Sequence, residues 1–334
     1  MKDYSAYLKE KFPAKVKFVE RIEALIGKED ARKFFEICYT PTGNSIRCNT
    51  LKISVEDLKK RLEGYGWKIR QPFVEFSEVI IVDSKLGPGE IGNSKEHLLG
   101  YYYVQDISSM LPMMVLRPEA GDFVLDLCAS PGSKTTQAAA MMENSGTIIA
   151  NEVSMGRVAI LNSNLERCGV MNAIVTRKEG VALCERFLKK SKFRFDKILV
   201  DAPCSGEGTL RKSPKTFEMW NLNMIKKMAG VQKRLATAAL KLLKVGGTMI
   251  YSTCTLAPEE DEAVVDYLVK NFDVTVEKIE LPLKFRSGVV EWDGVMFDSS
   301  VKNCLRLYPQ DNDTDGFFVA KLRKVGDKEL GGKR

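Results

Sequence analysis

A strand, a turn of small residues and the start of a helix follow one another in Phe123-Val-Leu-Asp-Leu-Cys-Ala-Ser-Pro-Gly-Ser-Lys-Thr135. The apolar run is typical of a buried strand, and the small residues after it let a ligand approach the backbone. A Walker loop is excluded because Cys128 and Ser133 stand where that loop needs glycine. The dinucleotide fingerprint G-x-G-x-x-G is also absent from this turn. The stretch therefore predicts a ligand site of another kind at the end of a strand.

Two charges frame this turn. Asp126 lies at the strand end and Lys134 opens the helix, which suits a ligand carrying both ammonium and carboxylate groups. The methionine end of S-adenosylmethionine is one such ligand. The next strand ends in Asn151-Glu152, where a carboxylate can accept both ribose hydroxyls. A solvated loop acid is the alternative interpretation of Glu152.

The chain from about Tyr101 onward alternates between short apolar runs and helical stretches. Strand-like runs lie at Phe123–Ala129, Thr147–Val153, Ala173–Arg177, Lys197–Ala202 and Thr248–Thr253, and helical stretches at Lys134–Met142, Met155–Cys168, Met224–Leu243 and Pro258–Phe272. This alternation predicts an α/β fold with a Rossmann-like, mostly parallel sheet between two layers of helices. Cys304–Tyr308 and Phe317–Lys321 have no long helix between them, which indicates an antiparallel strand near the end of the sheet.

The first hundred residues have a different pattern. Phe12–Ile26 and Asp30–Cys38 have helical spacing, Ser45–Ile53 and Glu78–Asp83 are strand candidates, and Ser54 is placed to cap a helix through Leu62. We therefore expect a helical and small α/β accessory domain at residues 1–100. A catalytic domain at 101–325 and a flexible tail at 326–334 complete the expected organisation.

Composition sets outer limits on function. The net charge of +7 is a mild indication of a polyanionic partner, and no apolar run approaches the length of a membrane span. The N-terminus is charged, so we expect a cytoplasmic protein, and we expect it to be a monomer. None of the eight cysteines forms a Cys-x-x-Cys pair and His97 is the single histidine, so we expect reduced thiols and no metal.

Two cysteines follow predicted strands, where a parallel sheet presents its catalytic groups. Cys204 ends Asp201-Ala-Pro-Cys, and Cys254 ends Tyr251-Ser-Thr-Cys. Carbon 5 of cytosine is a poor nucleophile until a thiolate adds to carbon 6 and turns the ring into an enamine. That addition needs an acid at the ring nitrogen, for which Asp201 is the candidate, and a base must later remove the carbon 5 proton.

These residues resemble the NOP/SUN (RsmB-like) RNA cytosine-5 methyltransferases across residues 45–324. The resemblance is carried by Arg47-Cys-Asn-Thr-Leu-Lys52, Tyr103-Val-Gln-Asp106-Ile-Ser-Ser, Asp126–Thr135, Asn151-Glu152, Asp201–Gly208, Ser252-Thr-Cys254-Thr and Gly316-Phe-Phe-Val-Ala-Lys321. It implies a class I methyltransferase sheet, an RRM-like accessory domain that binds RNA, and S-adenosylmethionine as cofactor.

The resemblance also assigns roles to residues. It implies that Cys254 is the nucleophile, that Cys204 assists breakdown of the adduct, and that Asp201 lies near the base and the transferred methyl group. The implied cofactor contacts are Cys128, Ala129, Pro131, Gly132, Ser133, Lys134, Glu152, Arg157, Glu179 and Asp201. This chain departs from the family pattern at Ser133, where many relatives have Gly, and at Glu179, where Asp is usual.

Some alternatives stay open at this point. The RNA is either tRNA, which we favour, or rRNA. From another functional class, an RNA-binding assembly factor with an idle methyltransferase fold would be expected to lack one cysteine or the cofactor turn, and this chain retains both. An amino-methyltransferase would want Asp/Asn-Pro-Pro-Tyr/Phe in place of Asp201-Ala-Pro-Cys204 and is disfavoured.

Three further features lie beside the predicted site. Seven basic residues between Arg211 and Arg234 follow the Asp201–Gly208 loop, so we expect phosphate contacts there. Trp220 is placed either to stack on RNA or to pack in the core. The acids after Pro258, from Glu259 to Glu262, are interpreted as the start of a helix with carboxylates at its positive end, without a chemical role.

Overall fold

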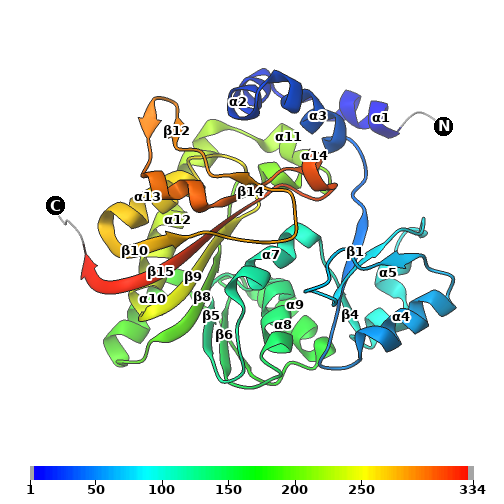
Figure 1. Ribbon diagram of the computed structural model, residues 1–334, viewed down its shortest axis with the longest axis horizontal. Coiled ribbons are helices and arrows are strands. Elements are labelled where there is room, and N and C mark those ends of the chain that lie inside the picture. The colour runs from blue at the N-terminus through cyan, green and yellow to red at the C-terminus, as the bar shows by residue number, and fades with distance from the viewer. Residues whose placement is uncertain (1–3, 330–334) are drawn as a thin grey trace.

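A computed structural model describes residues 4–329 and contains a nine-stranded central sheet (Figure 1). The strand order is β11-β14-β15-β9-β8-β5-β6-β7, with β10 also paired to β15. The five parallel strands are β5 (Phe123–Asp126), β6 (Thr147–Asn151), β7 (Ala173–Thr176), β8 (Phe195–Asp201) and β9 (Leu243–Thr253). The antiparallel strands are β10 (Phe272–Glu277), β11 (Arg286–Ser287), β14 (Leu305–Leu307) and β15 (Phe317–Glu329). The predicted α/β fold, with its parallel sheet and late antiparallel strands, is confirmed.

Helices cover both faces of this sheet because its strands alternate their side chains between two cores. Leu125, Ile198 and Met249 pack on one side with α10 (Gly180–Lys190), α12 (Leu222–Leu242) and α13 (Glu262–Asn271). Val124, Leu199 and Ile250 pack on the other side with α7 (Ile107–Leu116) and α8 (Ser133–Met141). The helix α9 (Met155–Cys168) packs beside α8 and β6 through Leu161 and Leu165.

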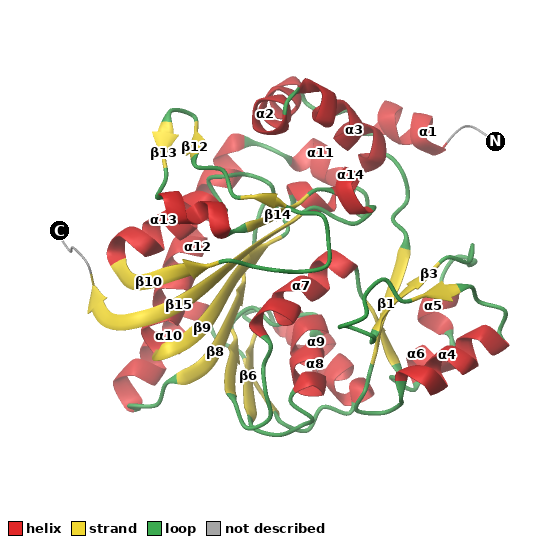
Figure 2. Cartoon of the chain, in the orientation of Figure 1, coloured by secondary structure: helices red, strands yellow, loops and turns green. Residues whose placement is uncertain are grey.

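A separate four-stranded antiparallel sheet stands beyond α8 and α9 (Figure 2). Its order is β2-β3-β1-β4, from β1 (Asn44–Cys48), β2 (Ile69–Arg70), β3 (Val79–Val82) and β4 (Tyr102–Val104). The helices of this region are α4 (Val55–Gly64), α5 (Glu90–Asn93) and α6 (Lys95–Leu98), and the Ser54 hydroxyl caps α4 as expected by accepting from the Asp57 amide. Because β4 pairs with β1, the small sheet extends past residue 100, where we expected the domains to divide.

The first three helices pack against the large unit rather than the small sheet. They are α1 (Tyr4–Lys11), α2 (Val16–Ile26) and α3 (Lys28–Cys38), and their core includes Phe217, Trp220 and Tyr308. Figure 1 shows them lying over the region of α11 (Lys215–Met219) and α14 (Pro309–Asn312). The remaining short elements are the 3-10 turns η1 (Glu207–Thr209) and η2 (Ser299–Asn303) and the hairpin of β12 (Glu291–Trp292) and β13 (Val295–Met296).

Two boundaries differ from the sequence prediction. The helix expected from Pro258 begins at Glu262, because residues 258–261 form a turn whose acids are held by distant partners. The strand β15 continues to Glu329, so residues 326–329 of the expected tail are extended, and residues 330–334 lie outside the described chain. Within residues 4–329, none of the helices combines the length and the apolar character needed to span a bilayer.

Candidate active site

The carboxyl ends of β8 and β9 bring the two cysteine loops together. These strands are parallel neighbours, with Asp201 paired to Ser252, so the loops that follow start side by side. The sulfurs of Cys204 and Cys254 lie 3.1 Å apart, and both thiols are free and partly buried. The hydrogen bond to Cys254, with burial second, raises the pKa of the Cys204 thiol well above its usual range. The raised pKa favours a protonated Cys204, and either sulfur can be the donor across this contact.

Asp201 lies beside this sulfur pair and is fixed by two donors. The Ser252 hydroxyl donates to its Oδ1 at 2.7 Å, and the Lys134 ammonium lies 2.8 Å from its Oδ2. Lys134 also donates to the Ser109 hydroxyl at 3.0 Å and is almost fully buried. A buried cation and a hydroxyl thus hold the carboxylate in one orientation.

Two cavities meet at Asp201 and Cys254, which line both. The first has a volume of about 440 Å³, within the range of small-molecule sites. It is lined by Leu127, Cys128, Ser130, Asn151, Glu152, Val153, Arg157, Lys178, Glu179, Gly180, Asp201, Ala202, Pro203, Cys204, Val231, Leu235 and Cys254. The second, of about 320 Å³, is lined by residues of β4, α7, α8 and β15 and of the loops before α7, after η1 and before β15, among them Tyr103, Asp106, Lys134, Lys212, Asp315 and Phe317.

Besides Asp201, the first cavity presents two carboxylates that follow strands. Glu152 is buried, accepts from the Ser154 amide at 2.9 Å through Oε1, and lies 3.3 Å from the Arg157 guanidinium through Oε2. Glu179 caps α10, because its carboxylate accepts from the Ala182 amide at 2.8 Å. Apolar walls from α12 face these acids. The chemistry of this set suits a ligand with hydroxyl groups at one place and a flat apolar ring at another.

The predicted cofactor residues divide between the two cavities. Cys128, Glu152, Arg157, Glu179 and Asp201 line the first. Pro131, Ser133 and Lys134 line the second, together with Asp201, and Ala129 and Gly132 line neither.

Contrary to the prediction from their positions in the sequence, Asp126 and Lys134 do not frame a common ligand site. Lys134 pairs with Asp201 instead, while Asp126 is buried behind the turn and accepts from the Thr135 hydroxyl at 2.7 Å. Burial raises the pKa of Asp126 to about 7. Its carboxyl group therefore supports the turn and lines neither cavity.

Comparison with known families accounts for this geometry. Residues 113–323 match the family model of the 16S rRNA methyltransferases RsmB/F. Residues 14–107 match the model of the N-terminal domain of 16S rRNA methyltransferase RsmF. The chain belongs to the RsmB/F methyltransferase family. The resemblance recognised in its motifs is thereby confirmed, and with it the class of enzyme, an RNA methyltransferase.

Two curated relatives illustrate the range of the family. The tRNA (cytosine(49)-C(5))-methyltransferase of Pyrococcus abyssi is 40% identical over 320 residues, which are 92% of this chain and 96% of that protein. The ribosomal RNA small subunit methyltransferase F of Vibrio campbellii is 40% identical over 312 residues, which are 92% of this chain but 63% of that protein. This chain therefore spans less than two thirds of the Vibrio relative.

Solved structures show the same fold. A methyltransferase homolog protein from Pyrococcus horikoshii superimposes with a TM-score of 0.83 at 34% identity, covering 97% of this chain and 100% of that one. NSun6 from Pyrococcus horikoshii, crystallised with the S-adenosylmethionine analogue SFG, superimposes with a TM-score of 0.75 at 26% identity, covering 98% of this chain and 99% of that one.

Buried acids behind the cysteines are the part of this site that the sequence did not reveal. Asp261 and Glu262 stand at the start of α13, as expected of acids at a helix start, but Glu260, Asp261 and Glu262 are all fully buried. Asp261 accepts from the Thr253 hydroxyl at 2.6 Å, and Glu262 forms a two-pronged pair with Arg306. Glu260 accepts from the backbone of Ser205 in the other cysteine loop. These acids anchor both loops, and only their distant partners distinguish them from an ordinary acidic helix start.

The basic cluster beside the site is partly structural, which corrects the expectation of phosphate contacts along its whole length. Arg211 is buried, donates to the carbonyls of Pro41 and Thr314, and pairs with Asp313. Lys212 is shared between two carboxylates that line the second cavity, those of Asp106 and Asp315. Besides Lys212, which is exposed but paired, the exposed members are Lys215, Lys226, Lys227 and Arg234.

The two alternatives for Trp220 are also decided. Trp220 is 4% exposed and donates to the Glu207 carboxylate at 2.6 Å, so it packs in the core and does not stack on RNA.

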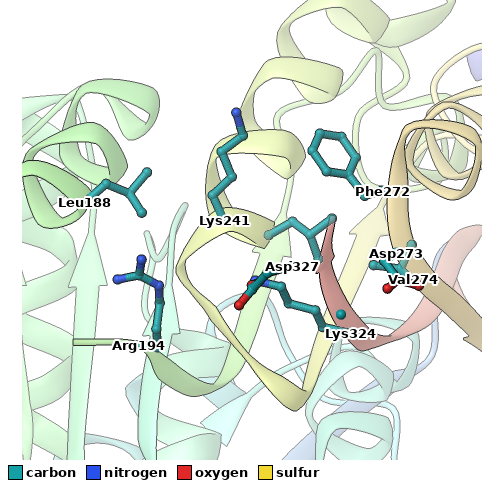
Figure 3. A pocket seen from close by; sticks show the side chains of 10 residues that line it. Leu188, Arg194, Lys241, Phe272, Asp273, Val274, Lys324 and Asp327 are labelled. Carbon is teal, nitrogen blue, oxygen red and sulfur yellow. The ribbon is translucent and has the colours of Figure 1, made fainter. Parts of the chain in front are cut away.

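A further cavity lies at the opposite end of the sheet. Its volume is about 270 Å³, and its walls include Arg194, Lys241, Lys324 and Asp327, as Figure 3 shows. It lies where β8 and β9 begin, so it is remote from the strand ends that carry the cysteines. Among the described residues, no group of three or more His, Cys, Asp or Glu side chains is arranged to hold a metal ion.

Proposed function

We propose that this protein transfers a methyl group from S-adenosylmethionine to carbon 5 of cytosine in RNA through a covalent adduct with Cys254. The observation that carries the proposal is the contact between the Cys204 and Cys254 sulfurs at the junction of the two cavities. Family membership and the two relatives support the reaction class.

The first cavity fits the cofactor chemically. Glu152 is placed to accept ribose hydroxyls, while Glu179 and the apolar wall of Val231 and Leu235 would flank the adenine. Asp201 lies towards the end that meets the second cavity, because it lines both cavities together with Cys254. Bound S-adenosylmethionine would supply an electrophilic methyl group at that junction. The cofactor roles inferred for Ala129, Pro131, Gly132, Ser133 and Lys134 stay proposals.

The second cavity is proposed to receive the flipped base, because it opens onto Cys254 from the other side. The Cys254 sulfur adds to carbon 6 as its proton passes to the ring nitrogen, which makes carbon 5 nucleophilic, and the Asp201 carboxylate is placed to accept a hydrogen bond from that N–H. After carbon 5 has been methylated, a base must remove its proton while the sulfur–carbon 6 bond breaks and Cys254 leaves as a thiolate.

Cys204 is suited to be that base only after the adduct has formed. Its thiol is held protonated first by the hydrogen bond to Cys254. Once the Cys254 sulfur is bonded to carbon, that cause is removed while burial remains, so Cys204 can lose its proton more readily than before and then accept the carbon 5 proton.

The test uses RNA with and without 5-fluorocytosine. Cys254→Ala should abolish both methylation and the covalent complex on a denaturing gel, whereas Cys204→Ala should accumulate the complex on ordinary RNA. Methylation by the Cys254→Ala variant would reverse the two roles. Failure of the unmodified enzyme to form any complex with the fluorinated RNA would instead favour the assembly-factor alternative.

The RNA is proposed to be tRNA. The support for tRNA is the Pyrococcus abyssi relative, which is named as a tRNA methyltransferase and is 40% identical to this chain over 320 residues. Bisulfite sequencing of RNA from a deletion strain would identify the missing 5-methylcytosine, and its absence from rRNA rather than tRNA would overturn this assignment. A monomeric state, a cytoplasmic location and the lack of a metal stay predictions.

A further inference from the structure

The loop that carries Cys204 is held on both sides of the cysteine by a buried pair of side chains. Glu260 Oε2 accepts from the Ser205 amide at 3.0 Å and from Gln232 Nε2 at 2.8 Å. Gln232 Nε2 also donates to the Pro203 carbonyl at 2.8 Å. Pro203 and Ser205 flank Cys204, so both neighbours of the sulfur-bearing residue are fixed by this pair.

The same pair ties the two cysteine loops to each other. Glu260 lies six residues after Cys254 on the same segment, and its carbonyl accepts from the Tyr251 hydroxyl on β9. The residues that directly follow the cysteines are also joined, because the hydroxyls of Ser205 and Thr255 lie 2.7 Å apart. The segment that carries one cysteine therefore sets the position of the other.

A buried carboxyl group at this position costs stability, which a purely structural role would not explain. Glu260 and Gln232 are both completely buried, and within the described chain the second carboxylate oxygen, Oε1, has no hydrogen-bond partner. Burial raises the pKa of Glu260 to about 7. Buried ionisable groups that lack full compensation concentrate at functional sites.

We infer that Glu260, with Gln232, is a positioning residue for Cys204 and controls the release of the methylated base from Cys254. The inference rests on the proposed function. Methyl transfer depends on Cys254 and Asp201, whose own contacts do not include Glu260. Displacing the Cys204 loop should therefore slow the step that follows methylation more than methylation itself.

The experiment follows a single turnover on unmodified RNA, measuring methyl transfer and the covalent fraction on denaturing gels. In Glu260→Ala the first methyl transfer should stay within a few-fold of normal, while decay of the complex slows about tenfold or more, the effect of losing a charge-assisted hydrogen bond. Glu260→Gln keeps an oxygen acceptor for Ser205 and should restore release to within about threefold. If Glu260 only stabilised the fold, the covalent complex would not accumulate in Glu260→Ala and be released almost normally in Glu260→Gln.

Two controls sharpen the result. Glu259→Ala changes the neighbouring acid, which contacts Arg21 and Trp292 instead of the cysteine loop, and should release at the normal rate. Gln232→Leu removes the donor to Pro203 and should also slow release, which tests the inference even if Glu260→Ala does not fold.

The inference is overturned if folded Glu260→Ala, or Gln232→Leu in its place, releases normally or loses methyl transfer without accumulating the complex. It is also overturned if the Glu259→Ala control accumulates as much. Failure of the proposed function is distinguishable, since Cys204→Ala would then accumulate no complex either.

Discussion

Protonation of the buried Glu260 carboxyl group should make the stability of the protein depend on pH. Its carboxyl pKa is raised by burial from 4.5 to about 7, so the folded state binds this proton more tightly than the unfolded state. The contribution of Glu260 to the free energy of unfolding is therefore fully present below about pH 4.5, and it is lost as the pH rises to about 7. Glu260→Gln, which cannot ionise, should be more stable than the native protein at pH 8 by on the order of 1–3 kcal/mol.

Urea unfolding of both proteins at pH 5 and pH 8 measures this difference. The gain in the free energy of unfolding should shrink towards the acidic pH, where the native carboxyl is increasingly protonated in both states. A gain of equal size at both values would show that Glu260 does not titrate in this range.

Lys134 gives a second prediction at the residue scale. Its ammonium is the cation beside Asp201, whereas Ser252 contributes a neutral hydroxyl to the same carboxylate. Lys134→Met should lower the single-turnover methylation rate by roughly 100-fold, because a preorganised charge next to the reacting centre is lost. Ser252→Ala should lower it by about tenfold or less, as expected for one neutral hydrogen bond. Equal losses in the two variants would argue against a specific role for the Lys134 charge.

At the scale of elements, the turn η1 supports the Cys254 loop through a glycine. The Gly208 amide donates to the Cys254 carbonyl at 2.9 Å, and a Cβ at Gly208 would lie 2.2 Å from the Gly316 carbonyl oxygen. Gly208→Ala should therefore destabilise the protein by about 1–3 kcal/mol and sharply reduce adduct formation. Gly230→Ala on α12 is the matched control, since nothing lies within 4 Å of its Cβ and helix propensity favours alanine by about 0.5–1 kcal/mol. Melting curves measure the stability of both variants, and trapping with 5-fluorocytosine RNA measures adduct formation. Equal melting temperatures and equal trapping in Gly208→Ala and Gly230→Ala would contradict this prediction.

The sequence predicted elements well where local pattern determines structure. The helix Met155–Cys168 was predicted with the bounds that α9 has, and Ser54 caps α4, because apolar spacing and capping are local properties. The two cysteines were expected at strand ends, and neighbouring parallel strands bring them together. Of the acids at 259–262, Asp261 and Glu262 lie at the helix start as predicted, but the turn before them was not foreseen because an acidic turn and an acidic helix start look alike in sequence. What separates them is pairing with Gln232 and Arg306, which no local pattern contains.

At the scale of the whole molecule, buried arginines join parts that lie far apart in the sequence. Arg47 on β1 donates to the Ser133 carbonyl and the Thr136 hydroxyl at the start of α8, which ties the small sheet to the cofactor turn. Arg211 joins the segment after α3 to the loop before β15. The accessory parts are therefore fixed relative to the active site by specific hydrogen bonds, and part of the basic excess serves this purpose.

The division between structural and exposed cations predicts how RNA binding should depend on salt. Lys226 and Lys227 are exposed on α12, which also lines the first cavity through Val231 and Leu235, whereas Arg211 is buried in hydrogen bonds. Lys226→Ala with Lys227→Ala should weaken RNA binding and reduce the slope of log affinity against log salt by about 1–2, since each phosphate contact contributes a little under one. Arg211→Met should lower the melting temperature yet leave that slope unchanged. Filter binding across a salt series measures both, and an unchanged slope in the double lysine variant would place the phosphate path elsewhere on the surface.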